Sequence, residues 1–309
     1  MNLQQLAYII AVDDYRHFVT AAEKSFVTQA TLSMMIKKLE EELELTLFDR
    51  QQHPVVPTPA GKEVLIQARR ILGETTNLFA MVKELKGEFS GEVRIGIIPT
   101  LAPYLLPLFI AQFSKTFPLL KIHIQELVTA EIIQQLHAQK LAIGLLATPL
   151  PPNDLAHERL FTERFFVYAA KQEKFPANKF VAPKQLHAHQ VWLLEEGHCM
   201  RNQVLNFCSL KSLTTHASQV TYDAGSLETL INMVDKNGGL TILPELALQH
   251  LTGAQLKNIR SFIPPTPQRE ISLVYMPHYP RRQLLQELKK SIIRHLPFEP
   301  VKGRVIAIS

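Results

Sequence analysis

The hydrophobic residues of the first 45 positions recur every three or four residues, which places them on one face of a helix. The first stripe consists of Leu3, Leu6, Ala7, Ile10 and Ala11. The second stripe consists of Leu32, Ile36, Leu39 and Leu43. Thr20 and Glu23 have the spacing of a capping box and predict a helix that begins after Thr20, and Thr28 predicts the start of the next helix. Two short helices joined by a tight turn indicate a helix-turn-helix, although a plain helical hairpin has the same periodicity.

A long helix is predicted from Thr58 onward, because Thr followed by Pro59 is a typical helix start. The hydrophobic positions beyond it alternate by four and three residues, as in the seam of a short coiled coil. They are Val64, Ala68, Ile71, Thr75, Leu78, Val82 and Leu85. The alternative is a helix that packs only against its own domain. Gly87 and Gly91 then indicate a hinge.

Beyond residue 91 the hydrophobic pattern changes from the helical period to the alternation of strands. Strands are predicted at residues 93–97, 122–124 and 141–146, and helical stretches at 104–117 and 131–140 lie between them. Alternating strands and helices predict an α/β domain with a mostly parallel sheet.

The composition is that of a folded protein, with 46% hydrophobic and 20% charged residues, and 309 residues suffice for about two domains. No apolar run approaches the roughly 18 residues of a membrane span, and the N-terminus lacks the features of a signal peptide. We therefore expect a soluble, cytoplasmic protein that does not bind a membrane. The net charge of +5 permits an anionic partner, but residues 1–90 carry a net charge of −2. Evidence for nucleic-acid binding by this segment must therefore come from its motifs.

The sequence lacks the common catalytic and cofactor motifs, among them a Walker loop, a Gly-x-Gly-x-x-Gly turn, His-Glu-x-x-His and Cys-x-x-Cys. We therefore expect no cofactor, no metal site and no enzymatic activity. The two cysteines, Cys199 and Cys208, are the remaining candidates for chemistry. Isolated cysteines of this kind are most often buried small hydrophobic residues.

Several N-terminal motifs resemble the DNA-binding domain of LysR-type transcriptional regulators. They are His17-Phe18, Ala21-Ala22, Val27-Thr28-Gln29, Thr31-Leu32-Ser33, Ile36-Lys37-Lys38-Leu39-Glu40, Leu47-Phe48-Asp49-Arg50 and Thr58-Pro59-Ala60-Gly61. The resemblance implies a winged helix-turn-helix over residues 1–58, with its wing at 50–56, and a linker and dimerisation helix over 59–88. It further implies a two-lobed α/β regulatory domain over 89–309, similar to periplasmic binding proteins. The chain would cross between the lobes near residues 163 and 268, so that lobe I comprises 89–162 and 268–309 and lobe II comprises 163–267.

This resemblance also implies the partners of the chain. Double-stranded DNA would contact the second helix of the motif through Gln29, Thr31, Ser33 and Lys37, and the wing through Arg50 and His53. RNA polymerase would be a further partner, and the chain would form a homodimer through its linker helix and a homotetramer from two dimers.

Three residues depart from the usual family pattern. Ala30 replaces a Pro, which loosens the start of the recognition helix, and Glu44 replaces a Gly that commonly ends it. Gln4 replaces a residue that is frequently basic, which removes one expected phosphate contact.

The segment from Gly197 to Cys208 resembles the redox segment of the hydrogen-peroxide-sensing members of this family. Other segments match in order and spacing: Ile98-Pro99-Thr100, Pro103 to Pro107, Leu193 to Glu196 and Ser226 to Leu230. The resemblance implies a regulator of the oxidative-stress response in which Cys199 reacts with peroxide and Cys208 resolves the product as a disulfide. The implied peroxide pocket consists of Thr100, Thr129, His198, Arg201 and Arg269. Asn202 stands where these sensors usually have Asp, so an ion pair at that position is not expected here.

The residues around Cys199 agree with a reactive role. The pattern of Met200, Val204 and Phe207 predicts a helix that begins near Cys199, and Arg201 follows closely. A helix N-terminus and a neighbouring cation are the usual surroundings of reactive cysteines. Nine helical residues span about 13 Å, whereas a disulfide needs Cα atoms within about 7 Å, so the bond would require the helix to unwind.

Two alternatives remain open from the sequence. The chain could be a LysR-type regulator that senses a small metabolite in the cleft between its lobes and has inert cysteines. It could also be a thiol peroxidase, in which turnover of peroxide rather than a change of shape is the output.

Overall fold

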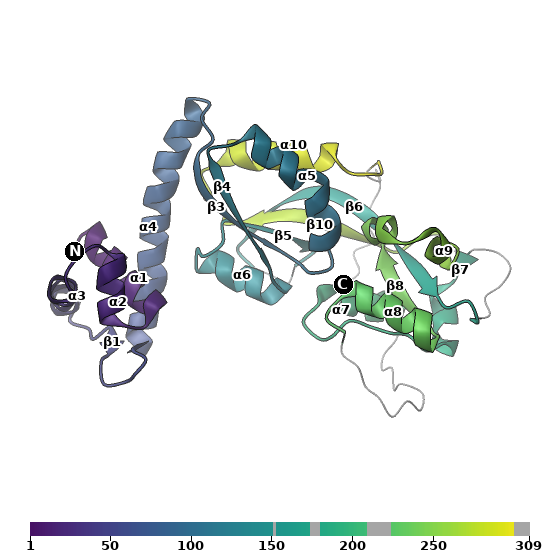
Figure 1. The fold of residues 1–309 in the computed structure, drawn as a ribbon, viewed down its shortest axis with the longest axis horizontal. Coiled ribbons are helices and arrows are strands. Elements are labelled where there is room, and N and C mark those ends of the chain that lie inside the picture. Colours follow the sequence, from purple (N-terminus) through teal and green to yellow (C-terminus); the bar gives the residue numbers. More distant parts are fainter. Residues whose placement is uncertain (151–152, 174–179, 209–223, 300–309) are drawn as a thin grey trace. The chain divides into compact units, whose positions relative to one another are not determined.

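The chain folds into two compact units, of which the first is essentially Met1–Glu88 and the second begins at Phe89 (Figure 1). The structure is a computed structural model, and it describes residues 1–150, 153–173, 180–208 and 224–299. The last ten residues of the predicted lobe I therefore lie outside the described residues, as do parts of the predicted lobe II.

The first unit opens with three helices, α1 (Leu3–Tyr15), α2 (Phe18–Lys24) and α3 (Gln29–Leu43). The predicted stripe of α3 is largely buried, and Thr28 caps α3 as expected. The predicted stripe of α1 is wrong: Leu6 is buried, but Leu3 and Ala7 are exposed, and the buried face of α1 instead carries Tyr8, Ile9 and Val12. The predicted start of α2 is wrong. The His17 ring nitrogen accepts a hydrogen bond from the Thr20 backbone N–H, so His17 is the N-cap and Thr20 lies inside the helix. Because α2 begins at Phe18 and not after Thr20, it is nearly one turn longer than predicted.

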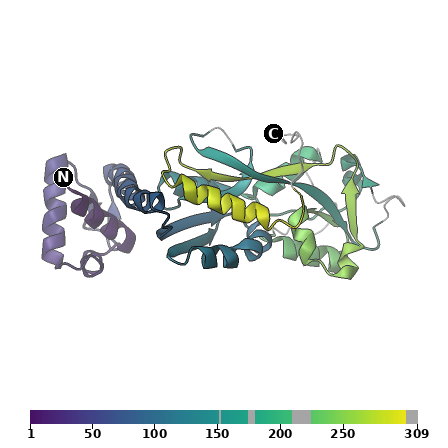
Figure 2. The same cartoon turned by 90° about the horizontal axis from the view of Figure 1, so that it is seen from above.

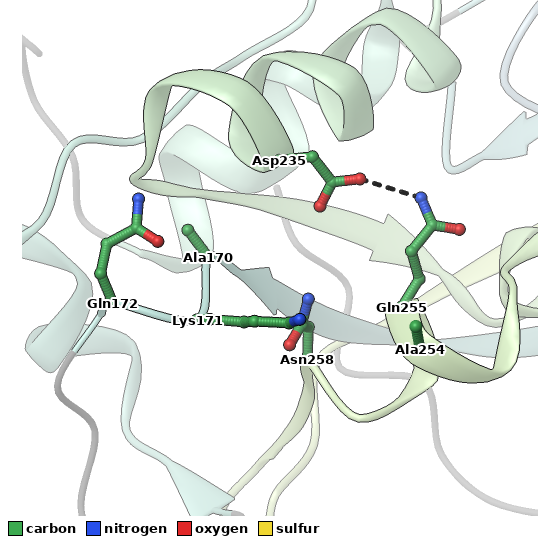
Figure 3. A pocket seen from close by; sticks show the side chains of 7 residues that line it. All are labelled: Ala170, Lys171, Gln172, Asp235, Ala254, Gln255 and Asn258. Atoms are coloured by element: carbon green, nitrogen blue, oxygen red, sulfur yellow. Dashed lines mark hydrogen bonds between the residues drawn. The ribbon is translucent and has the colours of Figure 1, made fainter.

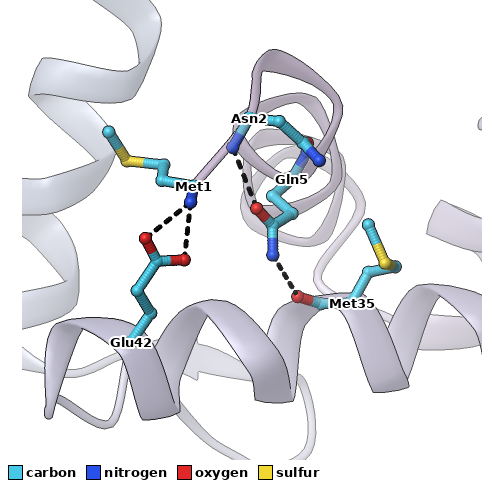
Figure 4. Close-up of polar contacts among 5 residues, drawn as sticks. All are labelled: Met1, Asn2, Gln5, Met35 and Glu42. Carbon is cyan, nitrogen blue, oxygen red and sulfur yellow. Dashed lines mark hydrogen bonds and ion pairs between the residues drawn. The ribbon is translucent and has the colours of Figure 1, made fainter.

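Polar groups of the N-terminal segment hold α1 against α3 (Figure 4). The Met1 ammonium group lies 2.6 Å from both carboxylate oxygens of Glu42. Asn2 and Gln5 form a reciprocal capping box at the start of α1. The buried Gln5 amide also donates to the Met35 carbonyl oxygen on α3 at 3.3 Å. These contacts join the start of α1 to the middle and the end of α3.

Helix α3 ends at Leu43, and its C-cap, Glu44, has the left-handed backbone conformation with φ of 54°. An altered cap was expected at this position, because Glu replaces the usual Gly and a side chain is disfavoured in this region. Ala30 does not delay the helix, which begins at Gln29. The chain then forms the predicted wing, in which β1 (Phe48–Asp49) pairs antiparallel with β2 (Val56–Pro57).

Helix α4 (Pro59–Leu85) begins as predicted, with the Thr58 hydroxyl accepting from the Gly61 backbone N–H at 2.9 Å. Its first turns are held on α1 by Arg69, which lies 2.8 Å from Asp13 and 2.5 Å from Asp14. Ala68 is the buried member of the predicted seam. The later members are exposed, namely Ile71, Leu78, Val82 and Leu85. Within the first unit, the described residues therefore leave an apolar face of α4 exposed.

The second unit is built on a sheet in the order β4-β3-β5-β10-β6-β9-β7, with β8 paired to β6. The strands are β3 (Gly91–Ile97), β4 (Leu120–Glu126), β5 (Ile143–Thr148), β6 (Ala156–Ala169), β7 (Phe180–Val181), β8 (Leu240–Pro244), β9 (Ile259–Phe262) and β10 (Gln268–Tyr275). The fold is α/β as predicted, but the sheet is mixed rather than mostly parallel. Strand β3 runs parallel to β4 and β5, whereas β10 pairs antiparallel with both β5 and β6. The chain leaves the first half of the sheet along β6 and returns to it along β10. Because β10 lies beside β6, the two strands run in opposite directions.

The long strand β6 belongs to both halves of this unit. Its first part pairs with β10, and its last residues pair with β8 and β9. The helices α5 (Ala102–Thr116) and α10 (Arg282–Arg294) pack together on one face, and α6 (Thr129–His137) lies on the other (Figure 1). The half of the unit that contains β7, β8 and β9 carries α7 (Cys199–Phe207), α8 (Leu227–Asn237) and α9 (Gly253–Leu256) (Figure 2). It also has 3-10 turns at Pro183–Ala188 and Glu245–His250.

Candidate functional site

The predicted DNA-contacting residues of α3 lie at its first two turns and just beyond. Gln29 and Lys37 are exposed, whereas Thr31 and Ser33 are half-buried. The Thr31 hydroxyl is 2.9 Å from the Thr28 hydroxyl, so Thr31 also supports the helix cap. Gln29, Ser33 and Lys37 follow one another at intervals of four residues and form one polar face.

The wing presents the other two residues predicted to contact DNA. His53 is exposed. Arg50 donates to the Glu40 carboxylate at 2.8 Å, and its guanidinium lies over the Phe18 ring, 5.1 Å from the ring centre. Arg50 therefore connects the wing to α3 and α2. A DNA phosphate that bound Arg50 would compete with Glu40 for its guanidinium group.

Cys199 is the first residue of α7, as the sequence predicted. Its thiol is free and partly exposed. The turn before it requires Gly197, whose φ of 98° lies in the region that side chains rarely adopt. A methyl group added at Gly197 would come within 3.9 Å of Val128, the residue that precedes Thr129. The start of α7 therefore lies close to the start of α6, and the N-terminal end of a helix is where negative charge is favoured.

Cys208 is the C-cap of the same helix, and its environment differs from that of Cys199. It is not part of a disulfide, and only 1% of the residue is exposed. Burial raises the pKa of the Cys208 thiol to about 12, because an apolar environment disfavours the thiolate. Cys208 is thus held as a protonated thiol at neutral pH.

Thr100 and Arg269, which the sequence assigned to one pocket, are in direct contact. The Arg269 Nη1 group donates to Thr100 Oγ1 at 2.9 Å, and Nη2 donates to the Thr100 carbonyl oxygen at 3.1 Å. Arg269 also donates through Nε to Glu163 Oε1 at 2.8 Å. All three residues are buried, with the side chains of Arg269 and Glu163 completely inaccessible.

The other assigned pocket residues lie near α7 and α6. The Thr129 hydroxyl oxygen at the start of α6 is buried and has no hydrogen-bond partner in the described part of the chain. The His198 ring is buried, with Nε2 3.6 Å from a Glu195 carboxylate oxygen. Arg201 instead donates to the Leu194 carbonyl oxygen at 2.7 Å, which anchors the first turn of α7. Asn202, the departure from the family pattern, is exposed.

Sequence reasoning missed two residues of this region. Gln203 lies one helical turn beyond Cys199, and its Oε1 atom is buried without a hydrogen-bond partner among the described residues. The spacing of four residues from Cys199 was visible in the sequence and could have indicated a shared helix face. Glu163 lies opposite Arg269 on neighbouring strands, which no local sequence pattern could indicate.

A separate hollow of about 280 Å³ lies in the half of the second unit that carries α8 and α9 (Figure 3). It is lined by Ala170, Lys171, Gln172, Asp235, Ala254, Gln255 and Asn258. Asp235 accepts hydrogen bonds from Tyr168 and Gln255. The hollow is therefore polar, and all the residues that line it come from the predicted lobe II. Within the described ranges, no three metal-binding side chains gather to hold an ion, and no helix is long and apolar enough to cross a membrane.

The chain is similar to known proteins over nearly its whole length. It is 35% identical over 293 residues to "DNA-binding transcriptional dual regulator OxyR" of Escherichia coli, which covers 94% of this chain and 95% of the relative. It is 33% identical over 295 residues to "Hydrogen peroxide-inducible genes activator" of Haemophilus influenzae, covering 94% and 96%.

Solved structures extend the similarity to the fold. A full-length OxyR variant from Pseudomonas aeruginosa matches with a TM-score of 0.77 at 30% identity, covering 94% of this chain and 97% of that one. A cysteine mutant of Corynebacterium glutamicum OxyR with hydrogen peroxide bound matches with a TM-score of 0.62 at 26% identity, covering 95% and 92%.

Two family models also match this chain. The bacterial regulatory helix-turn-helix protein model of the lysR family matches residues 3–62, and the LysR substrate binding domain model matches residues 86–297. The chain therefore belongs to the LysR family of bacterial regulators.

Proposed function

We propose that this protein is a DNA-binding transcriptional regulator of the oxidative-stress response that senses hydrogen peroxide through Cys199. The observation that carries the proposal is the contrast between its two cysteines. Cys199 is partly exposed at the start of a helix, whereas Cys208 is buried and protonated at the other end. The similarity to relatives named as peroxide-inducible activators over nearly the full chain supports it.

Peroxide is small and neutral, so a protein can bind it only through a few well-placed hydrogen bonds. We assign this role to Thr100, Thr129, His198 and Arg269, and we add Gln203. The buried Thr129 hydroxyl and Gln203 carbonyl oxygen have no partner among the described residues, and a buried polar group without a partner is unfavourable. A bound peroxide would satisfy both groups. Arg201 supports this pocket indirectly, through its bond to Leu194.

The chemistry takes two steps. The Cys199 thiolate attacks one peroxide oxygen, an S–O bond forms, the O–O bond breaks, and hydroxide leaves and takes up a proton as water. Sulfur is oxidised and peroxide is reduced. The Cys208 thiolate then attacks the Cys199 sulfur, an S–S bond forms, and the sulfenic oxygen leaves and is protonated to water. The second step requires Cys208 to leave its buried position and lose its proton.

The output of the oxidation is a change in DNA binding. We propose that residues 1–58 bind double-stranded DNA through Gln29, Thr31, Ser33 and Lys37, with the wing residues Arg50 and His53 on the phosphates. The exposed apolar face of α4, within residues 59–88, supports a homodimer, and two dimers would form a homotetramer. Residues 89–309 then act as the redox-sensing domain, and RNA polymerase is the partner at the promoter. On this proposal the protein works in the cytoplasm, has no cofactor and is not an enzyme.

A thiol titration tests the sensing step directly. The reduced protein should show two free thiols per chain and none after one equivalent of peroxide. An unchanged thiol count would favour the alternative in which a small metabolite is sensed and the cysteines are inert. Multi-turnover consumption of peroxide in the presence of a thiol reductant would favour the thiol peroxidase alternative.

A further inference from the structure

Glu163 and Arg269 form an ion pair that is completely shielded from solvent and lies directly beside Thr100. The two residues are opposite one another on the antiparallel strands β6 and β10. Glu163 Oε1 lies 2.8 Å from both Nε and Nη2 of Arg269. Its other oxygen, Oε2, accepts from the Leu246 backbone N–H at 2.9 Å, so both ends of the carboxylate are fixed. The position of the guanidinium is thereby determined from one side by Glu163.

The opposite side of the guanidinium determines the orientation of the Thr100 hydroxyl. Arg269 has only donors, so its Nη1 bond to Thr100 Oγ1 occupies a lone pair of that oxygen. The hydroxyl hydrogen of Thr100 must therefore point away from Arg269. Thr100 is held as a hydrogen-bond donor, which is what the oxygen that leaves during peroxide reduction needs.

We propose that Glu163 is a positioning residue for peroxide reduction: it fixes Arg269, which in turn fixes Thr100 as a donor to the departing peroxide oxygen. Glu163 touches neither peroxide nor Cys199. This inference rests on the proposed function, because it presupposes that Thr100 belongs to the peroxide pocket.

The test compares two reactions of Cys199 in the full-length reduced protein. One is oxidation by hydrogen peroxide, in which an oxygen leaves, and the other is alkylation by iodoacetamide, in which the leaving group is iodide and needs no hydrogen bond from Thr100. Both rates are followed by mass spectrometry of the Cys199 peptide. We expect Glu163→Gln to slow the peroxide reaction about tenfold or more, the effect of one misplaced charge-assisted hydrogen bond, and to leave alkylation unchanged. Glu158→Gln is the matched control, because Glu158 is on the same strand and bonds Tyr275 instead.

A double-mutant cycle with Thr100→Val separates positioning from general destabilisation. If Glu163 acts through Thr100, the double variant should oxidise no more slowly than Thr100→Val alone. Additive losses, an equal loss of alkylation, or a normal peroxide rate in Glu163→Gln would each overturn the inference while leaving the pocket intact. A normal peroxide rate in Thr100→Val would instead overturn the assignment of the pocket, and this inference with it.

A second variant guards against misfolding of Glu163→Gln, which leaves Arg269 without its counter-ion. Glu163→Asp keeps the charge but is one methylene shorter, so it cannot hold Arg269 and the Leu246 N–H together as Glu163 does. It should slow peroxide oxidation and spare alkylation by the same criteria. A normal peroxide rate in this variant would overturn the inference as firmly as one in Glu163→Gln.

Discussion

Cys199 and Cys208 lie at opposite ends of a single helix, with Cys199 as the first residue of α7 and Cys208 as its C-cap. A helix rises about 1.5 Å per residue, so nine residues separate the two Cα atoms by about 13 Å. A disulfide needs them within about 7 Å. Neither cysteine is part of a disulfide in this structure, and formation of a bond between them would require α7 to unwind or rearrange. On the proposed mechanism, oxidation is therefore coupled to a change of local fold.

The two thiols should differ in reactivity toward alkylating reagents. With a pKa of about 12, only about one Cys208 thiol in 10⁴ is ionised at pH 8, and the residue is also buried. We expect iodoacetamide to modify Cys199 in the native protein and to spare Cys208 until a denaturant is added. Peptide mass spectrometry after a timed reaction measures this order. Equal labelling of both cysteines in the native state would contradict it.

The same burial makes stability depend on alkaline pH. The Cys208 pKa rises from 9.0 to about 12 on folding, so the folded state favours the protonated thiol. This contribution is complete below about pH 9 and is lost as the pH rises toward 12. Relative to Cys208→Ser, the native protein should therefore lose unfolding free energy over this interval. Denaturant titrations of both proteins at pH 8 and pH 10.5 measure the difference, and parallel curves would exclude the effect.

Thr100→Val should slow the oxidation of Cys199 by peroxide, because it removes the hydroxyl that Arg269 orients and keeps a similar volume. Loss of one such hydrogen bond in the pocket corresponds to about tenfold. Thr148→Val is a suitable control, since its hydroxyl is also buried and bonded, to Glu270 and Ser272. The rate is measured by stopped reaction and thiol counting. Equal rates in the native protein and Thr100→Val would remove Thr100 from the pocket.

Ser33→Ala should weaken binding to the operator without affecting the fold. Ser33 shares the polar face of α3 with Gln29 and Lys37, and no neighbouring cap depends on it. Thr31→Ala is a less specific test, because the Thr31 hydroxyl also contacts the Thr28 cap. Loss of one base or phosphate contact costs about 1–3 kcal/mol, or about fivefold to 150-fold in affinity. A gel-shift titration at fixed salt measures this, and unchanged affinity together with an unchanged footprint would place α3 outside the interface.

Arg69→Met should destabilise the first unit, because Arg69 joins α4 to two carboxylates of α1. Desolvation opposes the charge of Arg69, and its bonds to Asp14 and Asp13 outweigh that effect, so its pKa is raised. Removing it leaves the largely buried Asp13 with only its partly exposed partner Arg16. We expect a loss of about 1–3 kcal/mol in unfolding free energy. Arg94→Met, which breaks an exposed pair with Glu92, should cost much less in the same denaturation experiment.

The sequence sufficed for the elements whose stabilising contacts are local. The stripe of α3, the Thr28 cap and the Thr58-Pro59 helix start were all predicted, because each depends on neighbours within a few residues. The start of α2 was not, because His17 acts as a cap where Thr20 and Glu23 presented a more typical signal.

The site could be predicted only in part, for a related reason. The cysteines and Thr100 were indicated by motifs, but their supporting partners are distant in sequence. Glu163 and Arg269 are 106 residues apart and meet only because β6 and β10 pair. The antiparallel pairing itself was missed, because alternating strands and helices favour a parallel sheet. The orientation of Thr100 therefore became visible only in the folded chain.

Replacing each cysteine should stop the redox reaction at a different point. Cys199→Ser should abolish the peroxide response, because Cys208 is buried and protonated. Cys208→Ser should trap a sulfenic acid at Cys199, which a dimedone probe detects. A Cys199→Ser protein that still changes its DNA footprint with peroxide would overturn the mechanism.

The aromatic packing around Phe207 should control how fast the disulfide closes. Phe207 precedes Cys208, stacks on Phe165 with ring centres 5.5 Å apart and meets the Phe262 ring edge-on at 5.4 Å. The Arg269 guanidinium lies over the Phe165 ring, 5.9 Å from its centre. Because Phe207 is the neighbour of Cys208 in the chain, we expect movement of Cys208 toward Cys199 to draw Phe207 out of these contacts. The packing therefore stabilises the reduced form and opposes the second step only.

Phe207→Leu should accordingly speed disulfide formation while leaving the oxidation of Cys199 unchanged. Each of the two aromatic pairs corresponds to about 0.5–1.5 kcal/mol, so we expect acceleration of about fivefold to a hundredfold. Rapid-quench samples, analysed for sulfenic acid and disulfide separately, resolve the two steps. Phe161→Leu is a matched control, because Phe161 forms an edge-on pair with Phe298 instead of with Phe207. If Phe207→Leu closed the disulfide no faster than the native protein, release of Phe207 would not limit the rearrangement, and the barrier would lie in unwinding the turns of α7 nearer to Cys199.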